Sequence, residues 1–130
     1  MKTFDVSTHS RSEMLDITAQ VQAAVRDAGI ADGLAVVWVP HTTAGVTINE
    51  NADPDVVHDM LGALDVMVPW RQDFYEHNEG NSAAHVKSSL MGCTVTILVN
   101  KGQLVLGTWQ GVYFCEFDGP RTRHFHVQCR

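Results

Sequence analysis

Leu34-Ala-Val-Val-Trp-Val39 is the stretch that decides the fold of this chain. Six apolar residues in a row suit a strand that is buried on both faces, so this segment is expected at the centre of a sheet. Gly33 opens the segment and Pro40 ends it. Further strands are predicted at residues 2–8, 46–48, 94–99, 103–106, 112–117 and 123–129, and the two around the turn at 100–102 form a hairpin.

Three helices are predicted from capping residues and apolar spacing. The first runs from a cap at Asp16 to about Ala28, where Gly29 ends it. The second starts at Asp53, followed by Pro54 in the first helical position, and continues to about Val68. A short third helix begins with Ser82 as its N-cap and ends near Gly92.

Composition limits the classes of protein to which the chain can belong. Its 130 residues fit one domain, and its net charge of −6 argues against general affinity for nucleic acid or an anionic membrane. No run of about 18 apolar residues is present, so no membrane span is expected. The start, Met1-Lys-Thr-Phe-Asp-Val, lacks the apolar core of a signal peptide, and we expect a cytoplasmic protein.

Three cysteines, Cys93, Cys115 and Cys129, form no CxxC pair, so neither a disulfide framework nor a zinc ribbon is indicated. Cys93 and Cys115 are expected to fill strand positions as small apolar residues.

His77-Asn-Glu-Gly-Asn-Ser-Ala-Ala-His-Val-Lys87 concentrates two imidazoles, a carboxylate, two amides and an ammonium group in eleven residues. Gly80 allows a turn with positive φ and the close approach of a ligand. The helix that follows presents free N–H groups that can hold a phosphate or carboxylate. The alternative is a polar loop whose histidines satisfy neighbouring backbone groups, and the segment alone does not decide between the two.

Other polar segments follow predicted strands, where a rigid sheet commonly holds the loops of a site. His41-Thr-Thr-Ala-Gly45 comes directly after the buried strand, although His41 can equally be a turn residue that bonds the backbone. Asn49-Glu-Asn51 is similarly placed, as part of the same pocket or as a solvated capping loop. In Gly107-Thr-Trp-Gln-Gly111, Gln110 can contact a ligand, whereas Trp109 is expected in the core.

The distribution of positive charge indicates the kind of ligand. An acidic chain that gathers cationic residues in its candidate site segments favours a small anionic ligand over a polyanion. The cationic residues are His41, His77, His85, Lys87, Arg121 and Arg123. Alternatively, the two arginines simply pair with Glu116 and Asp118.

Five motifs in chain order carry a resemblance to a known family, and together they span essentially the whole chain. They are His41-Thr-Thr-Ala-Gly45, Asn49-Glu-Asn-Ala-Asp-Pro54, His77 to Lys87, Leu106-Gly-Thr-Trp-Gln-Gly111 and Glu116-Phe-Asp-Gly-Pro-Arg121. The chain resembles the YjbQ family, the secondary thiamine-phosphate synthases. The resemblance implies a single α+β domain over residues 1–130, with β-sandwich-like mixed sheets, two main helices and one short helix. It also implies a homotrimer with a polar site near the subunit boundaries.

The activity that the resemblance implies joins hydroxymethylpyrimidine diphosphate to a thiazole phosphate with release of diphosphate. The catalytic candidates are His41, His77 and His85, and the substrate-binding candidates are Lys87, Asn81, Gln110, Asp118 and Arg121.

A divalent metal is the cofactor that the site composition suggests. Diphosphate displacement usually needs magnesium held by carboxylates, whereas motifs rich in histidine suit zinc or direct acid–base work. The metal candidates are His77, His85 and His41. Two hypotheses therefore stand: an enzyme that acts on a small phosphorylated molecule, and a non-catalytic trimeric module that binds a metal or metabolite.

Overall fold

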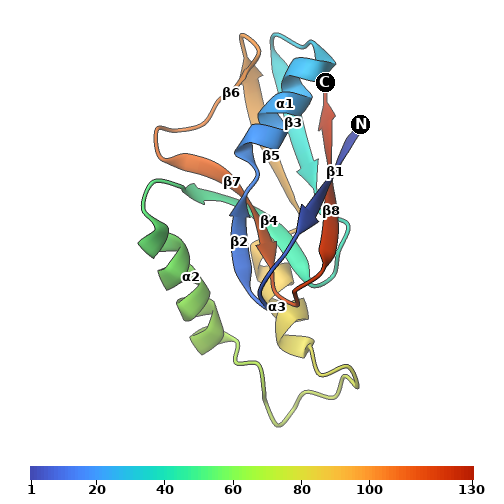
Figure 1. Ribbon diagram of the computed structural model, residues 1–130, viewed down its shortest axis with the longest axis vertical. Coiled ribbons are helices and arrows are strands. Elements are labelled where there is room, and N and C mark those ends of the chain that lie inside the picture. The colour runs from blue at the N-terminus through green and yellow to red at the C-terminus, as the bar shows by residue number, and fades with distance from the viewer.

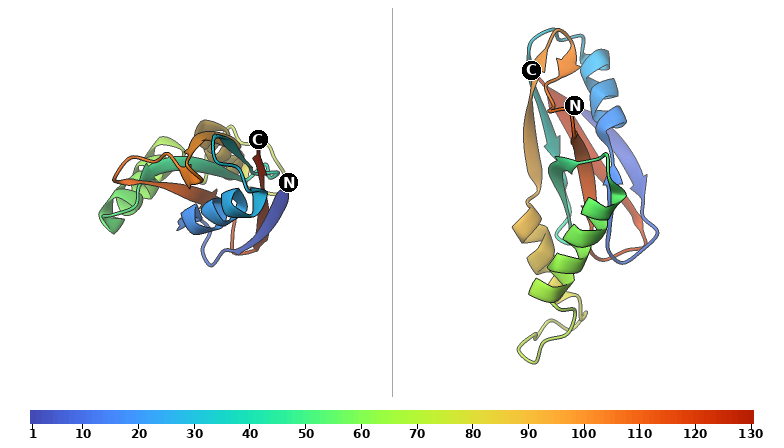
Figure 2. Two further views of the ribbon diagram at one scale, coloured as in Figure 1. Left: turned by 90° about the horizontal axis from the view of Figure 1, so that it is seen from above. Right: turned by 90° about the vertical axis from the view of Figure 1, so that its left-hand side faces the viewer.

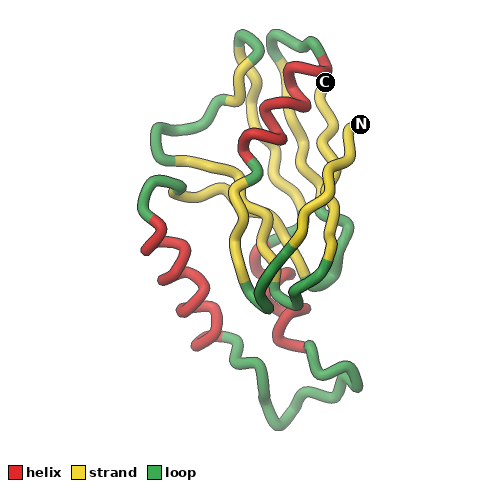
Figure 3. Tube along the Cα trace, viewed as in Figure 1, coloured by secondary structure: helices red, strands yellow, loops and turns green.

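The computed structural model describes residues 1–130 as two antiparallel sheets with three helices (Figures 1 and 3). This confirms the predicted α+β class, although every strand pairing is antiparallel. The elements in chain order are β1 (Lys2–Ser7), β2 (Glu13–Asp16), α1 (Thr18–Ala28), β3 (Gly33–Trp38), β4 (Ala44–Glu50), α2 (Pro54–Met67), α3 (Ser82–Met91), β5 (Thr94–Asn100), β6 (Gln103–Leu104), β7 (Gln110–Glu116) and β8 (Thr122–Cys129).

The larger sheet has the strand order β1-β8-β3-β5-β6, so β3 lies at its centre as predicted. Ala35 and Val37 of β3 point inward and are fully buried. Inward-facing and outward-facing residues alternate along β3, because successive side chains of a strand point to opposite sides of the sheet. On β8, Phe125 and Val127 are buried on the inner face, and His124 and His126 alternate with them on the outer face.

The smaller sheet, β2-β7-β4, joins the two apolar clusters of the molecule. Val46 and Phe114 belong to the main core, which they share with the larger sheet and with Val21 and Val25 of α1. The other face of the small sheet, which includes Tyr113, is covered by α2 and α3. Strand β2 was not predicted, because Glu13-Met-Leu-Asp16 is too short to show a period.

The first predicted helix is confirmed as α1, and its first residue differs slightly from the prediction. Its first residue is Thr18, and the Asp16 carboxylate accepts a hydrogen bond from the Thr18 N–H at 2.9 Å, so Asp16 caps the helix from just outside it. Gly29 ends the helix in the left-handed conformation, with φ of 68°.

Helices α2 and α3 lie at the same end of the molecule, and the segment between them extends beyond the sheets (Figures 1 and 2). Asp53 caps α2 as predicted, through a hydrogen bond from the Asp55 N–H. No residue of α2 is fully buried, because its apolar stripe only rests against the small sheet. Helix α3 lies close against β4, where a Cβ on Gly45 would stand 2.5 Å from the Gly92 carbonyl oxygen.

Predictions about two single residues are wrong. Trp109 was expected in the core but is 62% exposed, because it precedes β7 in a loop at the end of the small sheet. Cys93 is also exposed and lies just before β5 rather than within it. Cys115, in contrast, is buried in β7 as predicted, and burial raises its pKa to about 12.

The outer face of the larger sheet is left uncovered by the chain. Helix α1 packs on the inner face, while α2 and α3 pack on the smaller sheet. Leu34, Trp38 and Leu98 consequently expose 37%, 47% and 62% of their surface. The prediction that the strand at residues 34–39 is buried on both faces is therefore wrong, because no element of the chain covers its outer side. His126 also lies on this face, where its Nδ1 is 2.8 Å from the Thr3 hydroxyl.

None of the three helices is long and apolar enough to cross a membrane.

Candidate functional site

His77 and His85 come together at the start of α3, an outcome that the sequence left open. Their rings lie edge to face with centroids 5.4 Å apart. The approach depends on a turn in which the Gly80 N–H donates to the His77 carbonyl at 3.0 Å, and Gly80 has φ of 72°. The two histidines line an open hollow of about 380 Å³ together with Ser82 and Val86. Two imidazoles that are eight residues apart in the sequence thus lie side by side in the same hollow.

The start of α3 differs from the prediction by one residue. Asn81, not Ser82, occupies the N-cap position, and no side chain caps the helix. The Asn81 amide instead donates to Asp118 Oδ2 at 2.8 Å, while its buried Oδ1 has no hydrogen-bond partner in the chain. The Ala84 N–H donates to the Asn81 carbonyl at 3.0 Å and Ala83 is fully buried, so the Ser82 N–H is the group of the first turn that stays open toward the hollow.

His41 is the third predicted histidine, and its ring is anchored to backbone. Its Nε2 lies 3.0 Å from the His124 carbonyl oxygen and 3.1 Å from the His124 nitrogen. The alternative interpretation of His41 as a residue that bonds the backbone is therefore correct. His41 nevertheless shares a hollow of about 470 Å³ with His85, Ser88 and Cys93. His85 thus stands between His77 on one side and the His41 hollow on the other.

The pKa of His41 is lowered from its ordinary value of 6.5. Burial is the largest cause, and the nearby Arg123 and His124 add to it. Near neutral pH the His41 imidazole is therefore uncharged, which suits a hydrogen-bonding or base role rather than attraction of an anion.

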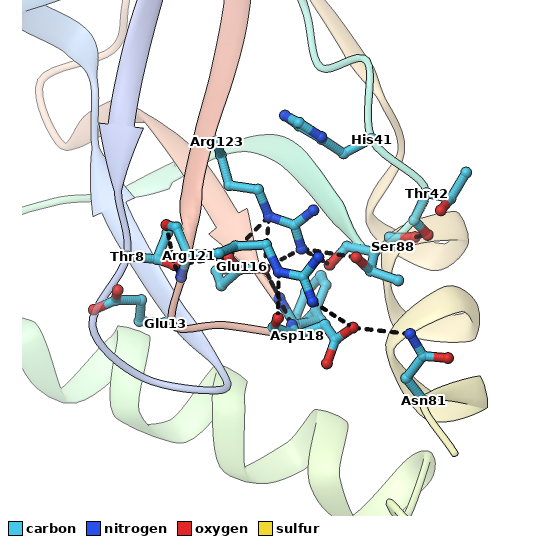
Figure 4. A network of polar contacts seen from close by, with 12 residues as sticks. Thr8, Glu13, His41, Thr42, Asn81, Ser88, Glu116, Asp118, Arg121 and Arg123 are labelled. Atoms are coloured by element: carbon cyan, nitrogen blue, oxygen red, sulfur yellow. Dashed lines mark hydrogen bonds and ion pairs between the residues drawn. The ribbon is translucent and has the colours of Figure 1, made fainter. Parts of the chain in front are cut away.

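Beneath the site, Glu116 of β7 and Arg123 of β8 form a buried ion pair (Figure 4). Arg123 Nε donates to Glu116 Oε1 at 2.9 Å, and Arg123 Nη2 donates to the Thr43 hydroxyl at 2.7 Å. The Thr8 hydroxyl donates to Glu116 Oε1 at 2.8 Å. Burial would raise the pKa of Glu116, but these hydrogen bonds and the one from the Asp118 N–H outweigh it and leave the pKa below its usual value.

Arg121 and Lys87 were predicted to hold a substrate, and both are already paired within the chain. Arg121 Nη2 lies 3.1 Å from Asp118 Oδ2, the oxygen that also accepts from Asn81. Lys87 is buried, and its Nζ donates to Asp65 of α2. These two residues stay predictions as ligand contacts, but their positive charges are largely neutralised. The expected cationic hollow is therefore less positive than the sequence indicated.

Gln110 is not brought to this site. It starts β7, whereas Glu116 ends it, and a strand of this length separates the two by about 20 Å. Its side-chain oxygen accepts a hydrogen bond from the Gly107 N–H at 2.8 Å and so closes its own loop. Asn51 and Gln110 lie at the same far end of the small sheet, where a Cβ on Gly111 would be 2.5 Å from the Asn51 amide nitrogen.

The residues of one chain do not fit the predicted metal site. His77 and His85 supply two imidazoles, but no group of three or more His, Cys, Asp or Glu side chains is arranged to hold a metal ion. Catalytic zinc sites usually take three protein ligands, and structural ones four.

A second hollow on the other side of His77 was missed by the sequence analysis. It measures about 670 Å³, and its lining includes Trp70, Arg71 and Tyr75. By its sequence pattern this segment is only a polar connector between two helices. An arginine flanked by aromatic residues just before the histidine motif was the signal that could have revealed the hollow.

Comparison with known proteins identifies the class to which this chain belongs. The model of the YjbQ-like UPF0047 proteins matches residues 2–130, and the chain belongs to that family. UPF0047 protein YugU of Bacillus subtilis is 53% identical over 128 residues, which cover 98% of this chain and 97% of that protein. UPF0047 protein MJ1081 of Methanocaldococcus jannaschii is 51% identical, with 96% and 90% covered.

Solved structures agree over the full length. An uncharacterized YjbQ/UPF0047 family protein from Clostridium acetobutylicum is 52% identical, covers all of both chains and superposes with a TM-score of 0.98. The conserved hypothetical protein TT1486 from Thermus thermophilus is 42% identical, again over all of both chains, with a TM-score of 0.93.

We predict that His41 titrates below 6.5, because its burial and the nearby Arg123 disfavour the imidazolium. The folded chain then binds fewer protons at His41 than the unfolded chain. The stability that His41 contributes is therefore complete above pH 6.5 and is lost as the pH falls toward the lowered folded-state pKa. An NMR titration of the labelled imidazole measures the value directly. A midpoint at or above 6.5 would show that His41 is more solvated than its contacts indicate.

Proposed function

We propose that this protein is an enzyme acting on a small phosphorylated molecule, of the type implied by the resemblance to secondary thiamine-phosphate synthases. In that reaction a bond forms between the thiazole nitrogen and the methylene carbon of the pyrimidine. The bond from that carbon to the diphosphate oxygen breaks, and diphosphate leaves with the electron pair.

The single observation that carries the proposal is the contact between His77 and His85, whose ring centroids are 5.4 Å apart. Two imidazoles this close can contact the same small ligand, and an imidazole can both donate and accept a proton. Proton transfer by a positioned histidine commonly accelerates a reaction by about 10²–10⁴-fold.

The surroundings of the pair support acid–base work on an anion. The start of α3 has no side-chain cap and presents Ser82 to the histidine hollow, and helix N-termini favour negative charge. In the proposed reaction one imidazole protonates the departing diphosphate, and the backbone groups stabilise the oxygens that gain charge. Neutral His41, across the adjoining hollow, completes the polar lining without adding charge.

The second candidate is a non-catalytic module that binds a metabolite. The observation that favours it is the pairing of Lys87 with Asp65 and of Arg121 with Asp118, since both cations then serve the fold. Such a module would still use the histidine pair, as hydrogen-bonding groups rather than as proton carriers.

We further propose that the protein assembles as a homotrimer in which the uncovered face of the larger sheet contacts another copy. Leu34, Trp38 and Leu98 supply exposed apolar surface there. Contiguous apolar patches on a soluble domain commonly mark interaction sites. Trp38 lies opposite His126 across β3 and β8, so this contact would extend toward the His41–His124 end of the sheet.

Size-exclusion chromatography with light scattering tests the assembly. We expect three times the chain mass of 14.3 kDa for the native protein. Leu98→Lys should shift the population to smaller species because it places a charge in the contact. Val66→Lys adds the same charge at an exposed position of α2, 81% exposed, and should leave the trimer intact. A native protein that elutes and scatters as a monomer would contradict this arrangement.

Turnover assays test the enzyme proposal. With hydroxymethylpyrimidine diphosphate and thiazole phosphate as substrates, His77→Ala and His85→Ala should each reduce the rate by about 10²-fold or more, because proton transfer is lost. His58→Ala is the matched control, since His58 is exposed on α2 with only Asp59 beside it. All three variants should melt near the native temperature. Unchanged turnover in His77→Ala and His85→Ala would refute an acid–base role for the pair.

A further inference from the structure

We propose that the connection between β6 and β7 (residues 105–109) presents Trp109 as an anchor that packs against the outer face of the larger sheet of a neighbouring copy. The inference rests on the assembly proposed above, which names this sheet face but not the surface that covers it. A closed ring of copies needs two different patches on each chain, because every copy presents one patch to the copy before it and the other to the copy after it.

Trp109 is a large apolar side chain that its own chain leaves uncovered. It exposes 62% of its surface, and Val105 in the same connection exposes 50%. Figures 1 and 2 show that β7 begins at one side of the molecule, next to the end of β4, so the connection that leads into it projects from the sheets. Tryptophan is enriched among the residues that contribute most to protein contacts. An exposed indole at a projecting end therefore indicates an anchor.

Hydrogen bonds hold the connection in shape before any contact forms. The Asn51 N–H donates to the Trp109 carbonyl at 2.9 Å, which ties the connection to the end of β4. The Gln110 N–H donates to the Gly107 carbonyl at 3.1 Å, and the Gly107 N–H donates back to the Gln110 side-chain oxygen at 2.8 Å. A side chain presented on a loop that is already ordered loses less conformational entropy when it binds.

The outer face of the larger sheet has the composition of a buried contact. Its outward positions on β1, β8, β3 and β5 include no lysine, arginine or glutamate, and Asp5 is their single carboxylate. Threonine, histidine and the exposed residues Leu34, Trp38 and Leu98 occupy most of the other positions. The centres of protein contacts are depleted of charged residues and enriched in aromatic ones in the same way.

The middle of this face offers a place for an indole ring. Leu34 pairs with Leu98 across β3 and β5, and Trp38 lies at the other end of β3. Val36 and Thr96 pair with each other between these larger side chains. A flat ring can therefore lie across the two smaller residues and contact an apolar side chain at each edge, and aromatic pairs gain contact beyond simple burial.

The charges of the two patches are complementary. Glu50 ends β4 beside the β6–β7 connection, and Asp16 Oδ2 lies 3.4 Å from the Asn51 amide nitrogen at the same end of the small sheet. The sheet face carries His124 and His126, whose ring N–H groups can donate to carboxylates. The acidic end of one copy would repel the acidic end of another, because like charges oppose association. The contact therefore joins unlike patches.

Size-exclusion chromatography with light scattering tests the anchor in the full chain. Trp109→Ala should weaken association by at least about tenfold and shift the population to smaller species, because anchor residues dominate contacts. Trp109→Phe should retain part of the association. Phe74→Ala is the matched control, since Phe74 is aromatic and 73% exposed in the segment between α2 and α3, and it should leave the assembly intact. Thermal melts show whether each variant is folded.

Oxidative footprinting tests the same contact without changing Trp109. The indole should be oxidised several-fold more slowly in the native protein than in Leu98→Lys, because that change disrupts the sheet face that covers Trp109 in the neighbouring copy. Phe74 should be oxidised equally in both proteins.

Equal oxidation of Trp109 in the two proteins, or a Trp109→Ala variant as fully assembled as Phe74→Ala, overturns the inference. If the native protein is a trimer and Leu98→Lys dissociates it, these results refute the role of Trp109 alone and leave the proposed assembly standing. A native protein that is a monomer overturns both.

Discussion

The buried ion pair between Glu116 and Arg123 is the interaction on which the candidate site depends. Glu116 is fully buried and Arg123 is 4% exposed, so each charge is stabilised by the other rather than by water. Thr8 and Thr43 supply further hydrogen bonds from the end of β1 and the start of β4. Four separate chain segments thus meet at one pair of charges, between the two sheets and next to α3 (Figure 4). Removing one partner of such a pair typically costs about 3–5 kcal/mol, because the other charge is left buried and unpaired.

The pair positions the site through the residues next to it in sequence. His124 follows Arg123, and its backbone holds the His41 ring. Asp118 lies two residues after Glu116 and binds Asn81, the N-cap of α3, as well as Arg121. The orientation of His41 and the start of the helix that carries His85 therefore both trace back to the same buried charges. This explains why an arginine and a glutamate that touch no proposed ligand sit at the centre of the arrangement.

Local patterns in the sequence predicted the elements well. The apolar run at residues 34–39 identified the central strand, and Asp53 with Pro54 identified the start of α2. The pairing of Arg123 with Glu116 and of Arg121 with Asp118 was also within reach, because each pair spans seven residues or fewer around one turn. Contacts between residues far apart in the sequence could not be predicted in this way. Lys87 meets Asp65 only because α2 packs beside α3, and Gln110 is removed from the histidines by the full length of β7.

The structure also changes the role assigned to the cationic residues. Counting cationic residues suggested a positive hollow, but charge in a folded chain depends on which partners are close. Most of the cations near the histidines proved to be structural. The hollow next to Trp70 escaped notice because it lies in a connector without periodicity. The site that results combines two adjacent imidazoles with cations that are mostly paired.

A double-mutant cycle on the buried pair is the most direct test of this account. Urea denaturation would be measured for the native protein, Glu116→Gln, Arg123→Met and the double variant. Each single change should cost about 3–5 kcal/mol, and the double variant should recover a large part of that loss, because no uncompensated charge remains. Losses that simply add, or single variants as stable as the native protein, would show that the fold and its site do not rest on this ion pair.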